Sequence, residues 1–335
     1  MAAIGSEIGD VLPDGTPIRS EEIGFAASEL LTCPKCSRPN SPERQNCIYC
    51  GESIGATTPD QLLSSLENTL ESWELGFNLV LRIDDEFDVG SSGRLGELLG
   101  ANVDLLKDSK NRGTVLPIGR YASIELAKAA LESFGDNRVK LGTVTDRELN
   151  ATQPPVRLRG IKFDEEHLIL HEFNTDGRVT VAANDLRLIV EGNLFETKTE
   201  ETQKKRRKNN PEIEVLKIES DRPVIDIYTK DNDRGFRSSI HGFDFSCLGS
   251  DKQLLAATNL SQLSKKLQAF SSECRLDNNY RLLRPMLDPI WELETAKDHK
   301  GMLRVGLERK GRTTVEIRTN DMQFTKYSRL QALSI

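Results

Sequence analysis

Four of the six cysteines in this chain lie within eighteen residues and form two Cys-x-x-Cys pairs. The pairs are Cys33 with Cys36 and Cys47 with Cys50. Each pair can fold into a tight turn that directs two thiolates at one point, and four thiolates complete the tetrahedral shell that zinc prefers. Gly51 follows the second pair and can adopt the left-handed backbone that such a turn needs. The spacing therefore predicts one Zn²⁺ ion held by these four cysteines.

The predicted zinc is structural rather than catalytic. The segment between the pairs is polar, so about twenty residues here cannot bury a core, and metal binding must supply folding free energy of about 10–16 kcal/mol. A catalytic zinc keeps an open coordination position, whereas four cysteines close the shell. Two disulfides are the alternative, but they need an oxidising compartment, and clustered cysteines favour a reducing one.

The segment over residues 31–53 resembles the short bacterial zinc-ribbon family. The matching features are Cys33-Pro34-Lys35-Cys36, an asparagine in the gap at Asn40, and Cys47-Ile48-Tyr49-Cys50-Gly51. Ser37 departs from the pattern, since the family usually has glycine after the second cysteine. The resemblance implies that the four cysteines are zinc ligands and that the ribbon is a structural or interaction module.

The surrounding elements predict an α+β multidomain chain. Residues 1–30 hold one arginine and six acidic residues without periodicity, which is typical of a disordered tail. Pro154 and Pro155 mark a linker, since consecutive prolines block helix and central strand. The predicted parts are a disordered acidic tail (1–30), the zinc ribbon (31–55), a linker helix (57–75), a small α/β sandwich domain (76–150) and a β-rich C-terminal domain with helices (156–335).

In the small α/β domain, apolar alternation and helical spacing predict three strands and two helices. Pro117 would confine its strand to a sheet edge. Ser123 is placed to cap the second helix. The predicted strands are Asn78–Ile83, Thr114–Arg120 and Val139–Val144, and the predicted helices are Leu95–Leu106 and Ser123–Phe134.

Beyond the linker, the apolar period becomes two from Val156 to Ile240, and a helix is predicted over Leu260–Phe270 with Thr258 or Asn259 as its cap. This order faintly resembles a pleckstrin-homology module, a bent β-sandwich closed by a helix, which implies binding of lipid headgroups or peptides. The other predicted elements include separate strands at Leu186–Leu194, Ile213–Ile218 and Val224–Thr229, a helix at Tyr280–Arg284 before Pro285, a hairpin around Lys310-Gly311, and a strand at Met322–Tyr327.

Several other motifs have a simpler interpretation than a functional one. The basic run Lys204–Lys208 could contact nucleic acid, but an exposed loop is favoured. His167 and His171 have metal-pair spacing only on a helix, whereas their surroundings predict a strand. The acidic and glycine-rich segment Asp84–Gly93 fits a solvated loop, and Cys247 fits a buried thiol without an activating base.

Composition limits the classes of function. Hydrophobic residues make up 37% and the net charge is −7, so a basic face for general phosphate binding is not expected. Neither a membrane span nor a signal peptide is predicted, which favours the cytoplasm. No residues are predicted as catalytic or as binding an organic cofactor.

We expect a zinc-binding, non-enzymatic protein that binds a macromolecule, most simply another protein. The alternatives are a nucleic-acid-associated factor that uses the ribbon and basic loop, and an enzyme with a site in the C-terminal half.

Overall fold

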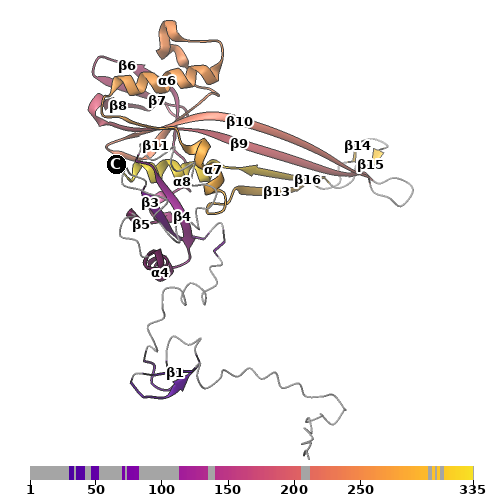
Figure 1. The fold of residues 1–335 in the computed structure, drawn as a ribbon. Coiled ribbons are helices and arrows are strands. Elements are labelled where there is room, and N and C mark those ends of the chain that lie inside the picture. The colour runs from indigo at the N-terminus through magenta and orange to yellow at the C-terminus, as the bar shows by residue number, and fades with distance from the viewer. Residues whose placement is uncertain are drawn as a thin grey trace, which may run out of the picture. The chain divides into compact units, whose positions relative to one another are not determined.

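The computed structural model describes residues 30–33, 35–41, 47–52, 70–71, 74–82, 113–134, 140–204, 212–300, 304–305, 308–309 and 313–334. The chain divides into two compact units, residues 1–65 and 66–335. In the described parts the fold is mixed α+β with strands dominating, which confirms the predicted class (Figure 1). No helix among these residues is long and apolar enough to cross a membrane. The predicted acidic tail, most of the linker helix, the Leu95–Leu106 helix and the Asp84–Gly93 loop lie outside the described residues.

The first unit contains a short antiparallel hairpin around the first cysteine pair. Its strands are β1 (Leu31–Thr32) and β2 (Pro39–Asn40). Leu31 lies opposite Asn40, and Thr32 lies opposite Pro39. This pairing reverses the direction of the chain after Cys36, so that Asn40 at the end of β2 lies beside Leu31 at the start of β1.

The second unit begins with a three-stranded antiparallel sheet in the order β4-β3-β5. The strands are β3 (Phe77–Arg82), β4 (Val115–Tyr121) and β5 (Lys140–Thr145). Helix α4 (Ile124–Phe134) packs on this sheet, and the Ser123 hydroxyl accepts a hydrogen bond from the N–H of Leu126, as the predicted cap requires. Strand β4 is an edge strand, which confirms the expectation from Pro117. Helix α5 (Asp146–Leu149) follows β5 directly.

A nine-stranded sheet forms the centre of the second unit, in the order β13-β16-β9-β10-β11-β6-β7-β8, with β12 (Arg275–Asp277) paired to β9. Most neighbours are antiparallel, but β11 runs parallel to β6. The strands are β6 (Val156–Phe163), β7 (His167–Glu172), β8 (Arg178–Ala182), β9 (Leu186–Lys204), β10 (Glu212–Thr229), β11 (Asn232–Ser239), β13 (Glu294–Lys300) and β16 (Thr313–Thr319).

The main core lies between strands β6–β11 and helix α6 (Ala256–Phe270). Leu260, Leu263 and Leu267 of α6 are buried against the strands, as their spacing predicts. The predicted cap was wrong: the helix begins at Ala256, so Thr258 and Asn259 lie inside its first turn, and the Asn259 side chain exchanges hydrogen bonds with the backbone of Gln253. Strands β6–β11 followed by α6 match the predicted order of elements, and the pleckstrin-homology resemblance itself stays a prediction.

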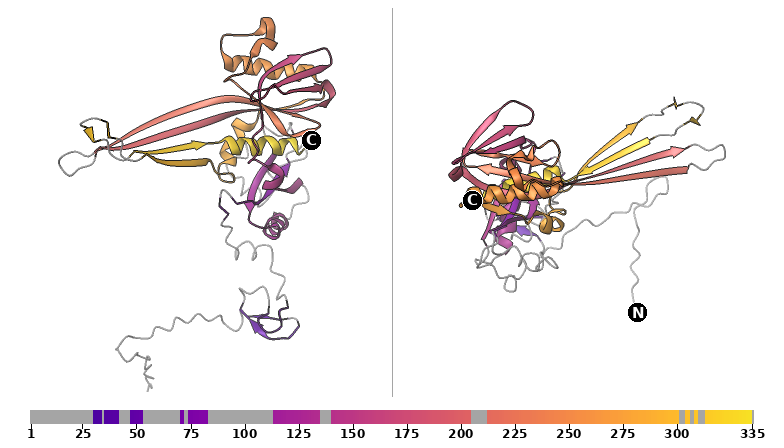
Figure 2. Two further views of the ribbon diagram at one scale, coloured as in Figure 1. Left: turned by 180° about the vertical axis from the view of Figure 1, so that it is seen from behind. Right: turned by 90° about the horizontal axis from the view of Figure 1, so that it is seen from above.

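Strands β9 and β10 form a hairpin far longer than the sequence predicts. They pair along their whole length, from Leu186 opposite Thr229 to Lys204 opposite Glu212. Figure 2 shows β9 and β10 extending together with β13 and β16 away from α6. The prediction of two separate strands at Ile213–Ile218 and Val224–Thr229 was therefore wrong. The polar stretch between them is held in the strand because β9 pairs with it throughout.

The C-terminal predictions also need correction. Helix α7 (Tyr280–Leu287) runs through Pro285 instead of ending before it. The predicted strand at Met322–Tyr327 lies in helix α8 (Asp321–Ala332). Strand β16 pairs with β13 and β9. The short strands β14 (Arg304–Val305) and β15 (Glu308–Arg309) pair with each other. Among the described residues, these pairings take the place of the hairpin expected around Lys310-Gly311.

Helix α8 connects the small sheet to the large one. The Gln331 side chain accepts from the N–H of Val115 at 3.0 Å and donates to its carbonyl at 2.6 Å. Arg329 donates to the carbonyl of Leu149 at 3.0 Å. The two regions predicted as separate domains, 76–150 and 156–335, thus share buried hydrogen bonds within the second unit.

Candidate metal centre

The two cysteine pairs fold into turns with the same backbone hydrogen bonds. In the first turn, the N–H of Ser37 donates to the carbonyl of Cys33 at 2.9 Å, and the N–H of Cys33 donates to Arg38 at 3.0 Å. In the second turn, Gly51 donates to Cys47 at 2.9 Å, and Cys47 donates to Glu52 at 2.7 Å. The offsets along the chain are identical, so each pair is presented by an equivalent turn.

Each turn closes through a residue with a left-handed backbone. Gly51 has a φ of 72°, as its position predicts. The equivalent residue in the first turn, Ser37, has a φ of 55° although it carries a side chain. An L-residue in this region costs roughly 1–2 kcal/mol. The departure from glycine at Ser37 therefore leaves the turn geometry intact but strains it.

The four sulfur atoms converge on one point. Cys33 Sγ lies 3.6 Å from Cys50 Sγ, and Cys36 Sγ lies 3.4 Å from Cys47 Sγ. All four sulfurs lie within 4.8 Å of one another. A tetrahedron with zinc–sulfur bonds of about 2.3 Å has sulfur–sulfur edges of about 3.8 Å. The cysteines are free thiols with the spacing of a Cys₄ site for one metal ion, compatible with Zn²⁺.

Backbone and amide groups prepare some of these sulfurs for ionisation. Burial raises the pKa of Cys47, but N–H groups of Tyr49 and Cys50 outweigh it, and the pKa falls to about 6. A backbone N–H of Glu52 lowers the pKa of Cys50, but burial and the neighbouring thiols together raise it to about 12. Four close thiols cannot all lose their protons without a cation among them. The low pKa of Cys47 beside the high pKa of Cys50 fits a site that a divalent metal completes.

Asn40 supports the centre in a way that the sequence did not reveal. It is buried, and its amide nitrogen donates to Cys47 Sγ at 3.6 Å and to the carbonyl of Arg38 at 2.8 Å. Its amide oxygen accepts from the N–H of Ile48 at 3.1 Å. One side chain thus ties the first turn to the second. The only signal in the sequence was its presence in the gap between the cysteine pairs.

The surface beside the centre is partly apolar. Ile48 is 53% exposed and Tyr49 is 51% exposed, both on the second turn. The guanidinium of Arg38 lies 4.7 Å from the centroid of the Tyr49 ring. Lys35 and Glu52 form an exposed ion pair at 2.7 Å between the two turns. The metal centre therefore presents an aromatic and an aliphatic side chain to solvent on a small, fixed scaffold.

The histidine pair does not form a metal site. His167 and His171 lie on strand β7, as predicted, and no metal-ligand group among the described residues includes either one. Of the basic run, only Lys204 is described, as the last residue of β9; residues 205–208 lie outside the described part.

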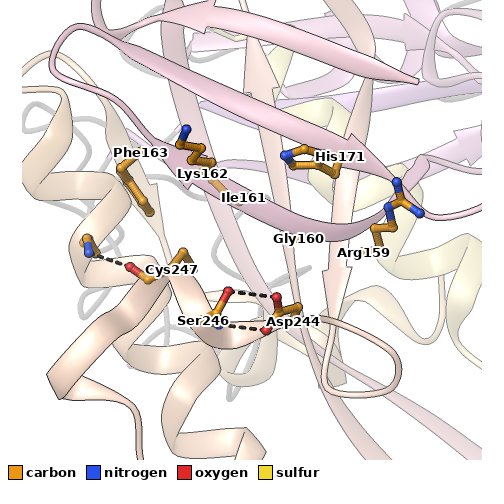
Figure 3. Close-up of a pocket in the computed structure, with 10 residues that line it drawn as sticks. Arg159, Gly160, Ile161, Lys162, Phe163, His171, Asp244, Ser246 and Cys247 are labelled. Carbon is orange, nitrogen blue, oxygen red and sulfur yellow. Dashed lines mark hydrogen bonds between the residues drawn. The ribbon is translucent and has the colours of Figure 1, made fainter. Parts of the chain in front are cut away.

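Cys247 and His171 line a cavity of about 520 Å³ between β6, the 3₁₀ helix Phe245–Asp251, and α6 (Figure 3). Cys247 is half-buried rather than buried as expected, because it lies at the wall of this cavity, and desolvation raises the pKa of its thiol. Ser246 donates to Asp244 at 2.7 Å, and Lys266 donates to the carbonyl of Cys247 at 2.6 Å. Among the described residues, no hydrogen bond joins the Cys247 thiol to His171, so the cavity lacks an assembled nucleophile–base pair.

The sequence also missed a buried ionic cluster around Asp146. This carboxylate contacts Arg120 at 2.7 Å and Lys326 at 3.1 Å, and all three side chains are at most 11% exposed. Asn78 donates to Asp146 and accepts from the indole N–H of Trp291, which is buried. These residues come from five distant segments, so no local pattern could reveal them. The cluster is closed by its own contacts and joins the small sheet to α8.

Comparison with known proteins gives no assignment: no family model, no curated protein and no solved structure matches this chain. The zinc-ribbon and pleckstrin-homology resemblances therefore gain no support from relatives. What stands is the Cys₄ group itself.

Proposed function

We propose that this protein is a zinc-binding, non-enzymatic, cytoplasmic protein that acts by binding a macromolecular partner, and that the zinc ribbon docks another protein. The observation that carries the proposal is a Cys₄ group next to exposed Ile48 and Tyr49. The zinc has a structural role: it fixes the two turns that hold these side chains. Catalysis at the metal is disfavoured because four thiolates leave no open position.

The exposed pair has the properties of an interaction anchor. Tyrosine buries a large area with few rotatable bonds and is enriched among residues that dominate binding energy. The Tyr49 ring already packs against Arg38, so it loses little conformational freedom on binding. The ion pair of Lys35 with Glu52 supplies a polar rim beside it.

A nucleic-acid-associated role is the alternative. Strand β9 ends at Lys204 and β10 begins at Glu212, so in the sequence the basic run begins at the end of β9 and precedes β10. This role requires salt-sensitive binding to RNA or DNA that weakens when the five basic residues become serine. An enzyme that uses the cavity at Cys247 is the third possibility, and it requires turnover that depends on groups in that cavity.

Affinity purification from the native host, with zinc measured on the same samples, tests the proposal. Under reducing conditions we expect one zinc per chain, retained in an Ile48→Ser/Tyr49→Ser variant and lost in a Cys36→Ser/Cys47→Ser variant. A specific protein partner should bind the wild type. The amount of partner captured should fall at least tenfold with the Ile48→Ser/Tyr49→Ser variant. Leu254→Ser/Leu255→Ser is the matched control, because these leucines are exposed in the second unit.

Two results contradict the proposal. One is a protein without stoichiometric metal whose spectra do not change with chelator. The other is partner capture that is the same for wild type and Ile48→Ser/Tyr49→Ser, since the ribbon surface would then be irrelevant.

A further inference from the structure

The outer half of β10 is the edge of the extended part of the large sheet. Strand β11 pairs only with Val224–Thr229 of β10. Over Glu212–Pro223, β10 pairs with β9 on one side, and no described strand pairs with its other side. Residues 213–221 are all exposed. Figures 1 and 2 show this hairpin extending away from α6 and strands β6–β8.

This edge carries apolar side chains where edges are normally protected. The side chains of Ile213, Val215, Leu216 and Ile218 are each more than half exposed. An exposed strand edge with unpaired N–H and carbonyl groups pairs readily with another strand, and proteins usually block it with charges, proline, bulges or a covering element. Pro223 lies only at the inner end of this edge. Charged residues are interspersed with these apolar ones, so the edge offers both apolar contacts and charge pairs to a second strand.

We propose that the occupant is the same segment of a second copy of this chain, paired antiparallel with Ile218 on the twofold axis. Residues directly opposite in an antiparallel pair point to the same face, so a symmetric pair must place one residue opposite itself. With Ile218 at that position, Lys217 faces Glu219 of the second copy. Glu214 then faces Arg222 of the second copy, and each pair occurs twice.

Charge distinguishes this register from its neighbours. Placing Glu214, Lys217, Glu219 or Asp221 on the axis sets like charges opposite each other, which is destabilising. Placing Val215 or Leu216 there brings no opposite charges together. Among these registers, only the one centred on Ile218 sets opposite charges against each other, and it leaves no like charges facing; Asp221 faces Val215.

Two further features fit the same register. Lys217 and Glu219 form an ion pair within one chain at 2.5 Å, so the dimer would join two such pairs into a ring of alternating charges. On the other face, Leu216 and Ile218 of both copies become diagonal neighbours. The pairing also uses the whole available edge, since Ile218 is the midpoint between Glu212 and Val224, where β11 begins to pair.

Disulfide trapping of the full chain tests the register. In an Ile218→Cys variant, the new thiols of two copies face each other, and mild oxidation should give a covalent dimer. In a Val215→Cys variant, the thiols are six residues out of register, about 20 Å apart at ~3.3 Å per residue. This variant, equally exposed in the monomer, should stay at the wild-type background.

Sedimentation equilibrium tests the charge pairing. The wild type should be a dimer, the single variants Lys217→Glu and Glu219→Lys should each weaken association at least tenfold, and the double variant should restore it. Circular dichroism checks that each variant is folded. A wild type that is monomeric at 100 µM, equal trapping of both cysteine variants, or failure of the double variant to recover would overturn the proposal.

Discussion

Replacing Asp146 with asparagine should destabilise the second unit strongly, because it removes the only carboxylate that contacts both Arg120 and Lys326 in the described cluster. Asp146 also accepts from the N–H of Gly76 at 2.9 Å and from Asn78 at 3.0 Å. Its side chain is 3% exposed, and those of the two cations are 9% and 11% exposed. At such burial, solvent screens the ions little.

The magnitude follows from the charges left behind. Removing one partner of a buried ion pair costs about 3–5 kcal/mol, since the remaining charge stays desolvated. Here both cations lose their contact with the Asp146 carboxylate, so we expect a loss within that range. This is a large fraction of a total stability of about 5–15 kcal/mol. The Lys326→Met change in the Asp146→Asn background should recover part of the loss, because it removes one unpaired cation.

Urea unfolding followed by tryptophan fluorescence measures the effect. Trp291 is a suitable probe because Lys326 lies 5.8 Å from its ring centroid, and a Trp73→Phe background isolates its signal. Arg159→Gln is a control, since its ion pair with Asp176 is exposed and should contribute about 0–1 kcal/mol. A loss below about 1 kcal/mol for Asp146→Asn, or no recovery in the double variant, would refute the reasoning.

The same carboxylate predicts a pH dependence. Burial alone would raise the pKa of Asp146, but Lys326 and the surrounding N–H donors lower it below its ordinary value. The unfolded chain therefore binds this proton more tightly than the folded one. The stabilisation is complete above the ordinary aspartate pKa of about 3.9 and is lost as the pH falls below it. Asp146→Asn should flatten the acid limb of the stability curve.

Two glycine-related predictions test the local geometry. Ser37→Gly should tighten zinc binding up to about fivefold in chelator competition, because it relieves a φ of 55°. Gly51→Ala, at a φ of 72°, should weaken zinc binding by about 1–2 kcal/mol. Equal zinc affinities of both variants and the wild type would contradict the strain assigned to this backbone region. Gly192→Ala should cost about 1–3 kcal/mol in urea unfolding, since an added Cβ would overlap the Phe324 ring. Gly142→Ala, whose Cβ would lie 3.7 Å from Val80, is its control, and an equal cost for both would contradict the packing.

Local chemistry determined the parts of this protein that the sequence predicts well. The cysteine group needs only two tight turns, and both are encoded within six residues by the cysteines and the position that follows them. Strands β6, β7 and β8 follow from alternation, and α4 follows from its cap and apolar face. Pro117 fixed an edge position because it cannot donate to a ladder.

The polar strands and the last helix were decided by tertiary contacts. The outer half of β9 has little apolar alternation, yet it is a strand because β10 and β16 pair with it on both sides. Helix α8 buries Lys326, Arg329 and Gln331. A prediction from the hydrophobic pattern alone would place these polar side chains in solvent. Their partners, Asp146, Leu149 and Val115, lie about two hundred residues away. Burial of a polar side chain is stable only when such a partner is present, and only the folded chain supplies it.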